Sequence, residues 1–460
     1  MRRIAIAIPG LILCAAAFAQ DEGQLQSDFR REGDELHKNC SQFKTIFSCL
    51  QTLVTGKPLH ITGGSIAPQN GMGVGAAFAY EKNVGESWRT NTNADAVGST
   101  NGSWRAGFYF KAIRTPSAPP VPVTVTQRPA PGAPLPSIQL QRAPEFNLYT
   151  QVISLNKLDY YGLGQFTPRP SLAFFGMRQA IVGGNGIVPL GNSGAAMFFE
   201  LNGRWVEIRG RLGDTSPSIE QVYTNATAPG LANQPGFFQP GEGLKFARSF
   251  SDRLHLNYSA TIQEYIALSD SQYSFQRLNL DFSHDIPLYR KQRSASANEA
   301  TGPDASPKSL EQPRFTHNRE GNINLRALVM ESFTGTGHVV PFYFQPTLGG
   351  ADINCDKMLA SYPDYRFRGP NLMLFRASIE HSIWGPLGAM LMADTGKVGI
   401  ARGDLGFDHL RHSYGVGLTI RAGGYPMVQL LFAFGGHEGT HTIAAINPAI
   451  LGGGARPSLY

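Results

Sequence analysis

The chain has 460 residues, of which 42% are hydrophobic and 16% charged, with a formal net charge of +6. Its mean hydropathy of -0.18 argues against a helical membrane protein but not against a membrane β-barrel, whose lumen residues offset its lipid-facing residues. The charge is modest and no dense Lys/Arg cluster is interleaved with aromatic residues, which argues against nucleic-acid binding.

The first 19 residues have the pattern of a secretory signal peptide. Arg2 and Arg3 precede an apolar run over residues 4–18, and Ala17-Phe18-Ala19 matches an A-x-A cleavage site. The mature chain is therefore expected to begin near Gln20. After this segment no run approaches the roughly 18 apolar residues of a membrane-spanning helix, so a membrane role requires a β-barrel.

Residues 20–58 form a short segment that is charged in its central part and poor in glycine. Its pattern is compatible with one or two helical turns around Phe43, Phe47 and Leu50. We expect a short N-terminal periplasmic or plug segment here.

The cysteines of the mature chain predict one local disulfide. Cys40 and Cys49 lie close together in an exported chain, and an oxidising compartment favours a bond between them, with two free thiols as the alternative. Cys355 is then left over as a free thiol that we expect to be buried or inert.

Residues 59–450 repeat short runs in which apolar and polar residues alternate, the period of a β-strand with one face of each kind. The alternation is clearest in residues 104–112, 254–263, 277–283, 323–329 and 413–421. At about 24 residues per strand and loop, the region holds about 16 strands, an even number that a single-chain barrel allows. We predict an all-β fold, a transmembrane antiparallel β-barrel of about 16 strands, with residues 451–460 as a C-terminal tail. A soluble double sandwich is the alternative.

Two Pro-rich stretches interrupt this region. Residues 115–145 and 292–316 contain too many prolines to form strand ladders, so both are expected to be loops. Barrels keep one set of turns short and lengthen the outer loops, so we assign both stretches to the extracellular side. For residues 115–145 a Pro-rich recognition element is the functional alternative to a solvated loop.

Residues 346–399 are the most informative stretch, because a loop with an arginine-rich turn is followed by two strands of alternating polarity. From residue 372 to residue 384 one set of alternating positions is apolar, although Leu374 and His381 break the pattern. The other set is Arg376, Ser378, Glu380 and Ser382. Charges of both signs on one face are typical of a water-filled lumen, so we interpret this stretch as barrel wall with a loop at its mouth.

Catalytic motifs are weak. Residues 437–441 read His-Glu-Gly-Thr-His, a match to the H-E-x-x-H zinc motif, but Gly435 and Gly436 precede it and no third ligand follows. On a strand, residues four apart lie about 13 Å apart, too far for one ion. A phospholipase whose Ser and His come from different strands stays an alternative. We predict no enzymatic activity, no metal and no cofactor.

Several short motifs resemble the bacterial surface antigen family, the outer-membrane barrels of the BamA and TamA type. They are Pro346-Thr347-Leu348-Gly349-Gly350, Tyr365-Arg366-Phe367-Arg368-Gly369, an inward Glu380, Ala393-Asp394-Thr395-Gly396-Lys397-Val398, and the LDYYGLG run at residues 158–164. The family's loop tip carries Leu- or Val-Arg-Gly-Tyr (or Phe), whereas this chain has Leu359-Ala360-Ser361-Tyr362. The family's periplasmic receptor domains have no counterpart in the short segment 20–58.

The resemblance implies an outer-membrane protein that helps insert or pass polypeptides, with the loop inside the lumen and the first and last strands meeting at a seam that can open. Implied partners are outer-membrane lipid and polypeptide substrates or other envelope proteins. A passive solute pore or a structural protein is the alternative, favoured by the missing receptor domains and loop arginine. The site residues it implies are Tyr362, Arg366, Arg368, Gly369, Glu380, Asp394 and Gly396.

The absent loop arginine raises the question of what replaces it. Arg366 and Arg368 lie an even number of positions from each other and from Arg376 and Glu380. If the extended run continues past residue 370, all four side chains lie on the same face of the strand. We therefore predict that Arg368, or in second place Arg366, points into the lumen toward Glu380 or Asp394 and fixes the loop. The alternative leaves both arginines solvated at the rim.

Overall fold

The computed structural model describes residues 58–114, 143–210, 216–250, 254–293, 317–384, 387–422, 425–436, 438–446 and 456–460, with a few positions between 26 and 37. The described positions between 26 and 37 are helical, and the Glu32 carboxylate accepts a hydrogen bond of 3.2 Å from the backbone amide of Leu59. The signal peptide, the predicted Cys40–Cys49 pair and most of both Pro-rich stretches lie outside the described residues.

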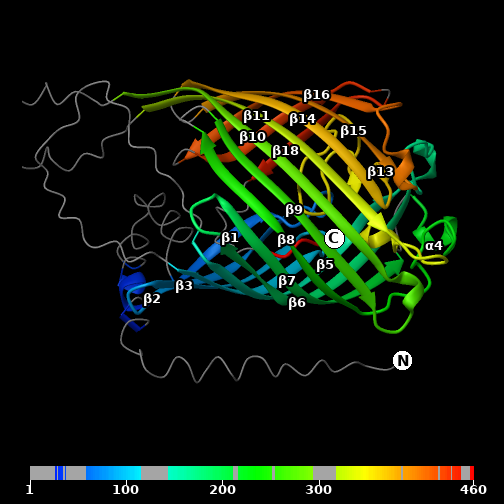
Figure 1. The fold of residues 1–460 in the computed structure, drawn as a ribbon, viewed down its shortest axis with the longest axis horizontal. Coiled ribbons are helices and arrows are strands. Elements are labelled where there is room, and N and C mark those ends of the chain that lie inside the picture. The colour runs from blue at the N-terminus through cyan, green and yellow to red at the C-terminus, as the bar shows by residue number, and fades with distance from the viewer. Residues whose placement is uncertain are drawn as a thin grey trace, which may run out of the picture.

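The described chain contains one 16-stranded sheet in which every strand is antiparallel to its neighbours in sequence order (Figure 1). This confirms the predicted all-β fold and its strand number. The strands are β1 (Leu59–Ser65), β2 (Met72–Val84), β3 (Trp88–Ser99), β4 (Trp104–Arg114), β5 (Glu145–Tyr160), β6 (Ala173–Pro189), β7 (Ala195–Gly210), β8 (Phe237–Phe250), β9 (Leu254–Ala267), β10 (Phe275–Arg293), β11 (His317–Phe333), β14 (Asn371–Trp384), β15 (Leu387–Gly399), β16 (Arg411–Ala422), β17 (Tyr425–Phe434) and β18 (His441–Ile446).

Short elements lie in the connections. A two-stranded sheet pairs β12 (Thr347–Leu348) with β13 (Phe367–Arg368). The helical turns are η2 (Arg169–Ser171), α4 (Ile219–Val222), η4 (Ser271–Tyr273), η7 (Phe342–Phe344) and η8 (Arg402–Asp404). No helix of the described residues has the length and apolar character needed to cross a membrane.

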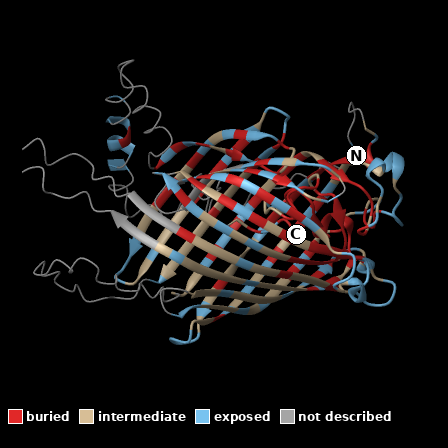
Figure 2. Cartoon of the chain, turned by 90° about the horizontal axis from the view of Figure 1, so that it is seen from above, coloured by how far each residue is buried: buried red, intermediate tan, exposed pale blue. Residues whose placement is uncertain are grey.

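The sheet curls around an interior, and its two faces differ as the alternation predicts (Figure 2). On β16 the outward Leu418 is 47% exposed, whereas the neighbouring Thr419, which faces inward, is 0% exposed. The same pattern leaves large apolar side chains exposed on most wall strands, for example Leu201 on β7 and Phe432 on β17. An apolar outer face with a polar interior is the arrangement of a transmembrane barrel, and a soluble sandwich does not expose so much apolar surface.

The first and last wall strands are the two edges of the sheet. β1 pairs with β2 and β18 pairs with β17, and among the described residues no ladder joins β1 to β18. The two edges nevertheless approach each other. Each edge therefore keeps one row of backbone donors and acceptors outside the sheet.

Antiparallel order assigns every connection to one end of the wall. The flanks of both Pro-rich stretches, between β4 and β5 and between β10 and β11, lie at the end where β1 begins. The connection between β11 and β14, residues 334–370, leaves the wall at the opposite end. The prediction that the Pro-rich stretches are extracellular is therefore incompatible with a periplasmic segment 20–58, because all three join the wall at the same end.

Candidate functional site

Residues 346–370, here named the lumen loop, fold back into the barrel and occupy its interior. Gly349 has φ +116 and lies so close to the chain that a Cβ would come 2.5 Å from the Pro363 carbonyl oxygen, so the predicted Gly-Gly turn needs glycine. The Gly164 amide donates 2.7 Å to the Arg368 carbonyl oxygen. This bond brings the two separate motif regions, residues 158–164 and 365–369, together.

The lumen loop packs on the wall through an apolar cluster. Leu359, Tyr362 and Phe367 are at most 1% exposed and pack with Leu374 of β14. The ring centroids of Tyr362 and Phe367 are 5.1 Å apart in an edge-on arrangement. Leu374 breaks the strand's polar pattern because its inward side chain lies under the loop and not in water.

Glycine lets the loop approach the wall closely. A Cβ on Gly396 of β15 would lie 2.7 Å from the Met373 carbonyl oxygen and 3.3 Å from Leu348 of the loop. A Cβ on Gly369 would lie 2.8 Å from the Gly399 carbonyl oxygen. Both glycines named by the sequence thus lie where the lumen loop and the wall are in contact.

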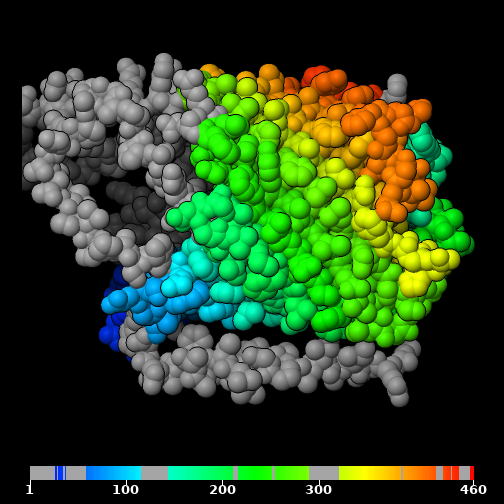
Figure 3. All heavy atoms as spheres, in the orientation of Figure 1, coloured from blue at the N-terminus to red at the C-terminus, as the bar shows by residue number. Residues whose placement is uncertain are grey.

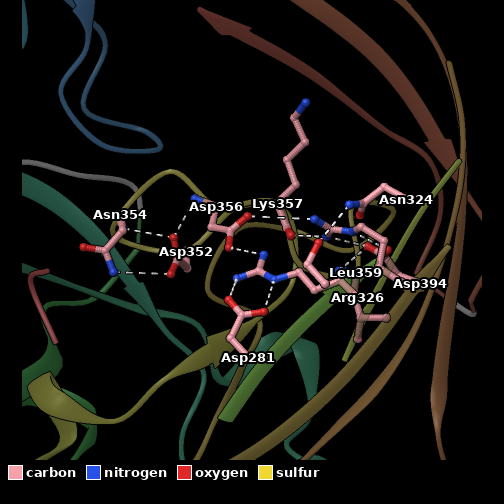
Figure 4. A network of polar contacts seen from close by, with 11 residues as sticks. Asp281, Asn324, Arg326, Asp352, Asn354, Asp356, Lys357, Leu359 and Asp394 are labelled. Carbon is pink, nitrogen blue, oxygen red and sulfur yellow. Dashed lines mark hydrogen bonds and ion pairs between the residues drawn. The ribbon is translucent and has the colours of Figure 1, made fainter. Parts of the chain in front are cut away.

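An ion-pair network connects the loop to four wall strands, β10, β11, β14 and β15 (Figure 4). The loop residue Asp356 accepts 2.7 Å from Arg326 Nη1 of β11, and its other oxygen lies 3.8 Å from Arg376 Nη1 of β14. Arg326 is also held by both oxygens of Asp281 at 2.9 and 2.8 Å. Arg376 is held by both oxygens of Asp394 at 2.8 and 3.0 Å. Each arginine therefore has one wall carboxylate of its own and shares the loop carboxylate.

Side chains of β15 and β16 fix the backbone at the loop tip. The Leu359 amide donates 3.1 Å to Asp394 Oδ2, and the Ser361 amide donates 2.8 Å to Ser413 Oγ. Leu359 has φ +55, a left-handed conformation that a branched residue keeps only where its surroundings hold it. Ala360, at the place of the family's loop arginine, is 0% exposed and packs in an apolar cluster with Met390 and Met392.

The predicted pairing of the loop arginines is wrong. Arg368 Nη1 donates to the carbonyl oxygens of Phe342 at 2.9 Å and Gln345 at 3.3 Å, and not to Glu380 or Asp394. The parity argument failed because Arg368 belongs to β13, which pairs with β12 and does not continue the line of β14.

The other predicted partners also have different contacts. Arg366 Nε and Nη2 each lie 2.7 Å from a Glu438 oxygen, and Arg366 Nη2 donates 2.7 Å to the Thr167 carbonyl oxygen. Glu380 accepts 2.8 Å from the hydroxyl of Thr419. Both arginines are buried, so the alternative of a solvated position at the rim is also wrong.

The H-E-x-x-H match has a structural role. Its described residues lie between β17 and β18 and at the start of β18, where Glu438 holds Arg366 and His441 Nδ1 donates 3.1 Å to the Tyr362 carbonyl oxygen. Among the described residues no group of three His, Cys, Asp or Glu side chains is arranged to hold a metal ion.

Burial shifts the pKa of several loop groups. Removal from water raises the pKa of Asp352 and of Asp364, and it raises the pKa of the Cys355 thiol to about 12. Burial, with Arg376 nearby, lowers the pKa of Lys357 to about 8. Cys355 is a free thiol that stays protonated at neutral pH, so it is not an activated nucleophile.

A polar cavity of about 360 Å³ borders the ion-pair network. Its lining is made of wall side chains from four neighbouring strands: Asn257, Ser259, Asp281, Ser283, Asn324, Arg326 and Arg376. This part of the lumen is suited to water and small polar solutes. The sequence prediction missed three residues of the site: Asp356, Arg326 and Glu438. The alternation along the strand places Arg326 on the inward face, but no local pattern identifies Asp356 as its partner in the loop.

A 16-stranded antiparallel barrel with a loop anchored inside its lumen defines the class of this chain by its fold. No family model and no curated protein matches the sequence. Among solved structures the chain is similar to BamA from Haemophilus ducreyi lacking POTRA domains 1-3, with a TM-score of 0.45 and 10% identity, covering 85% of this chain and 70% of that one.

Two further solved structures are similar to the chain. CdiB from Acinetobacter baumannii gives a TM-score of 0.44 at 10% identity, covering 84% of this chain. CdiB from Escherichia coli gives 0.46 at 9% identity, covering 85% of this chain. The chain spans 58% and 62% of these two proteins, so it is shorter than either. At such identities the likeness concerns the path of the backbone alone.

Proposed function

We propose that this chain is an outer-membrane β-barrel that helps insert polypeptides into the outer membrane or pass them across it. The observation that carries the proposal is the lumen loop held by the Asp356–Arg326–Arg376 network, with Asp394 and Asp281 completing the charges. A loop fixed inside the lumen leaves less room for the steady diffusion of solutes than an unobstructed barrel would. Outer-membrane lipid and unfolded polypeptides or other envelope proteins are the partners of this proposal.

The buried lumen loop weighs against the passive pore, the second candidate. Leu359 and Tyr362 are almost fully buried, and the loop residues Asp356 and Arg366 form ion pairs with Arg326 and Glu438 outside the loop. Opening a channel therefore requires breaking ion pairs of low exposure and uncovering an apolar cluster. Figure 3 shows the outer surface of the wall in the orientation of Figure 1 as a continuous layer of side chains over the strands.

The sheet edges support the insertion role. β1 and β18 are the two ends of the strand order and approach each other, with no ladder between their described residues. An extended polypeptide that adds to such an edge gains main-chain hydrogen bonds whatever its side chains are. A barrel whose client is itself built from strands can use this edge as a template.

The test is the folding of a client in liposomes. The mature chain is reconstituted, an unfolded small outer-membrane barrel is added, and its folded fraction is followed by its faster migration on unboiled gels. We expect faster client folding than in empty liposomes, with small and irregular currents in planar bilayers. No acceleration together with a large, steady conductance would establish the passive pore instead.

A further inference from the structure

Residues 456–460, Arg-Pro-Ser-Leu-Tyr, lie inside the barrel although they follow β18 in sequence. In both ribbon views the C mark lies within the outline of the wall (Figures 1 and 2). Leu459 and Tyr460 are 5% and 7% exposed. The wall therefore encloses a short peptide of its own chain, here named the 456–460 segment.

Two distant wall strands bind the segment. Arg456 Nη2 donates 2.8 Å to Asp95 Oδ2 of β3. Arg204 Nη1 of β7 donates 2.9 Å to the backbone carbonyl oxygen of Ser458. One contact recognises a basic side chain and the other recognises the peptide main chain.

The lumen loop supplies the other side of the site. Asn354 Oδ1 accepts 2.8 Å from the backbone amide of Leu459, a second main-chain contact. The hydroxyl groups of Tyr460 and Thr347 lie 3.3 Å apart. The Tyr460 side chain also lines a small recess, whose other lining residues include Phe175 and Arg368. The loop thus recognises the segment's backbone and its aromatic side chain.

The receptor side chains have supports that do not depend on the segment. Asp95 is held by Arg105 of β4 at 3.2 Å, and Arg204 donates to Gln239 of β8. The Asn354 backbone amide is fixed by Asp352 Oδ1 at 2.9 Å. Such a site exists before its ligand arrives, and a preformed site loses less entropy on binding.

We propose that the lumen contains a peptide-binding site, filled in cis by the 456–460 segment, and that this site accepts an extended peptide of the same chemistry in trans. The ligand class is an extended peptide with a basic side chain and, four positions later, a phenol. When the segment occupies the site, it links β3, β7 and the lumen loop and narrows the lumen. The proposal does not rest on polypeptide transport, because its tests contain no client protein.

The first experiment measures peptide binding. A chain without residues 456–460 is refolded in lipid nanodiscs and titrated with a fluorescent, N-acetylated Arg-Pro-Ser-Leu-Tyr peptide. We expect binding at least about tenfold tighter than to the full chain, whose tethered segment competes at an effective concentration in the millimolar range. Equal binding to both chains, or no binding to the truncated one, overturns the proposal.

A double-mutant cycle tests the assigned contact. We expect the peptide with Ala in place of arginine to bind the truncated chain about tenfold more weakly, because Asp95 is then left with one partner fewer. In the truncated chain carrying Asp95→Asn, the same change in the peptide should matter much less. Additive effects would show that the peptide binds elsewhere.

A measurement on the full chain covers the case in which the truncated chain fails to fold. Arg456→Ala should raise the mean bilayer conductance, because the segment loses its contact with β3. The control is Arg89→Ala, which removes an arginine that is 54% exposed in its pair with Glu81. Unchanged conductance in Arg456→Ala, or the same rise in the control, contradicts the proposal.

Discussion

The two carboxylates that meet Arg376 are predicted to differ sharply when each is replaced by asparagine. The side chain of Asp394 is 0% exposed and that of Asp356 is 35% exposed. In Asp394→Asn the nearest carboxylate oxygen to Arg376 is that of Asp356, at 3.8 Å. The hydrogen bond from the Leu359 amide to residue 394 also becomes weaker, because its acceptor is no longer charged. Breaking a buried pair in this way costs about 3–5 kcal/mol.

Asp356→Asn leaves both arginines in place. Arg326 keeps Asp281 and Arg376 keeps Asp394, so no buried charge loses its own partner. For a carboxylate that is about a third exposed, the loss after solvent screening is about 1 kcal/mol or less. The difference between the variants, about 2 kcal/mol or more, corresponds to at least about 30-fold in the docking equilibrium of the lumen loop.

Trypsin cleavage of the folded barrel measures this equilibrium, because Lys357 and Arg366 become accessible when the loop leaves the wall. We expect cleavage in the loop to be at least tenfold faster in Asp394→Asn than in Asp356→Asn. Asp270→Asn, in the exposed connection between β9 and β10, serves as the unchanged control. Equal rates in Asp394→Asn and Asp356→Asn, or the faster rate in Asp356→Asn, would refute the conclusion that Asp394 contributes more than Asp356 to holding the loop.

Three further predictions concern the lumen loop. Gly396→Ala should weaken docking, because the added Cβ lies 3.3 Å from Leu348 of the loop, and it also strains the β14–β15 ladder at the Met373 carbonyl, with a cost of about 1–3 kcal/mol. The same cleavage measures the change, and Gly403→Ala, whose added Cβ meets nothing within 4 Å, should have no effect. Cys355, whose thiol has its pKa raised to about 12, should react with a maleimide at pH 7.5 far more slowly when folded than in urea; equal rates would contradict the raised pKa. Between pH 8 and the ordinary Lys pKa of 10.5, Lys357 binds a proton in the unfolded chain but not in the folded one. The free energy of unfolding, and with it the urea concentration at the unfolding midpoint, should therefore rise with pH in this range. In Lys357→Met the midpoint should depend less on pH.

The wall was predictable because its signal is local. Alternation along each strand decides which side chain meets lipid and which meets the lumen, and no knowledge of distant residues is needed. Arg376 and Glu380 accordingly lie inside, as their parity predicts. The partner of Arg376 could also have been predicted. Because β14 and β15 are joined by a short connection, counting residues outward from that connection places Asp394 directly opposite Arg376.

The loop contacts were not predictable in the same way. Asp356 meets Arg326 only because the lumen loop folds back to β11, and Arg366 meets Glu438 across 72 residues of sequence. Neither contact leaves a periodic trace in the chain. The 456–460 segment is too short for any pattern, and its position follows only from the shapes of the wall and loop around it.

The contacts of the 456–460 segment also set an order of events during folding. Arg456 and Asp95 are 361 residues apart, and Arg204 and Ser458 are 254 apart, whereas the wall forms from hairpins between neighbours in sequence. Contacts between near neighbours form fast, and contacts across long separations form late. Docking of the 456–460 segment is therefore expected to follow the hairpins of the wall, so the lumen of a maturing barrel stays wider until residue 456 reaches β3.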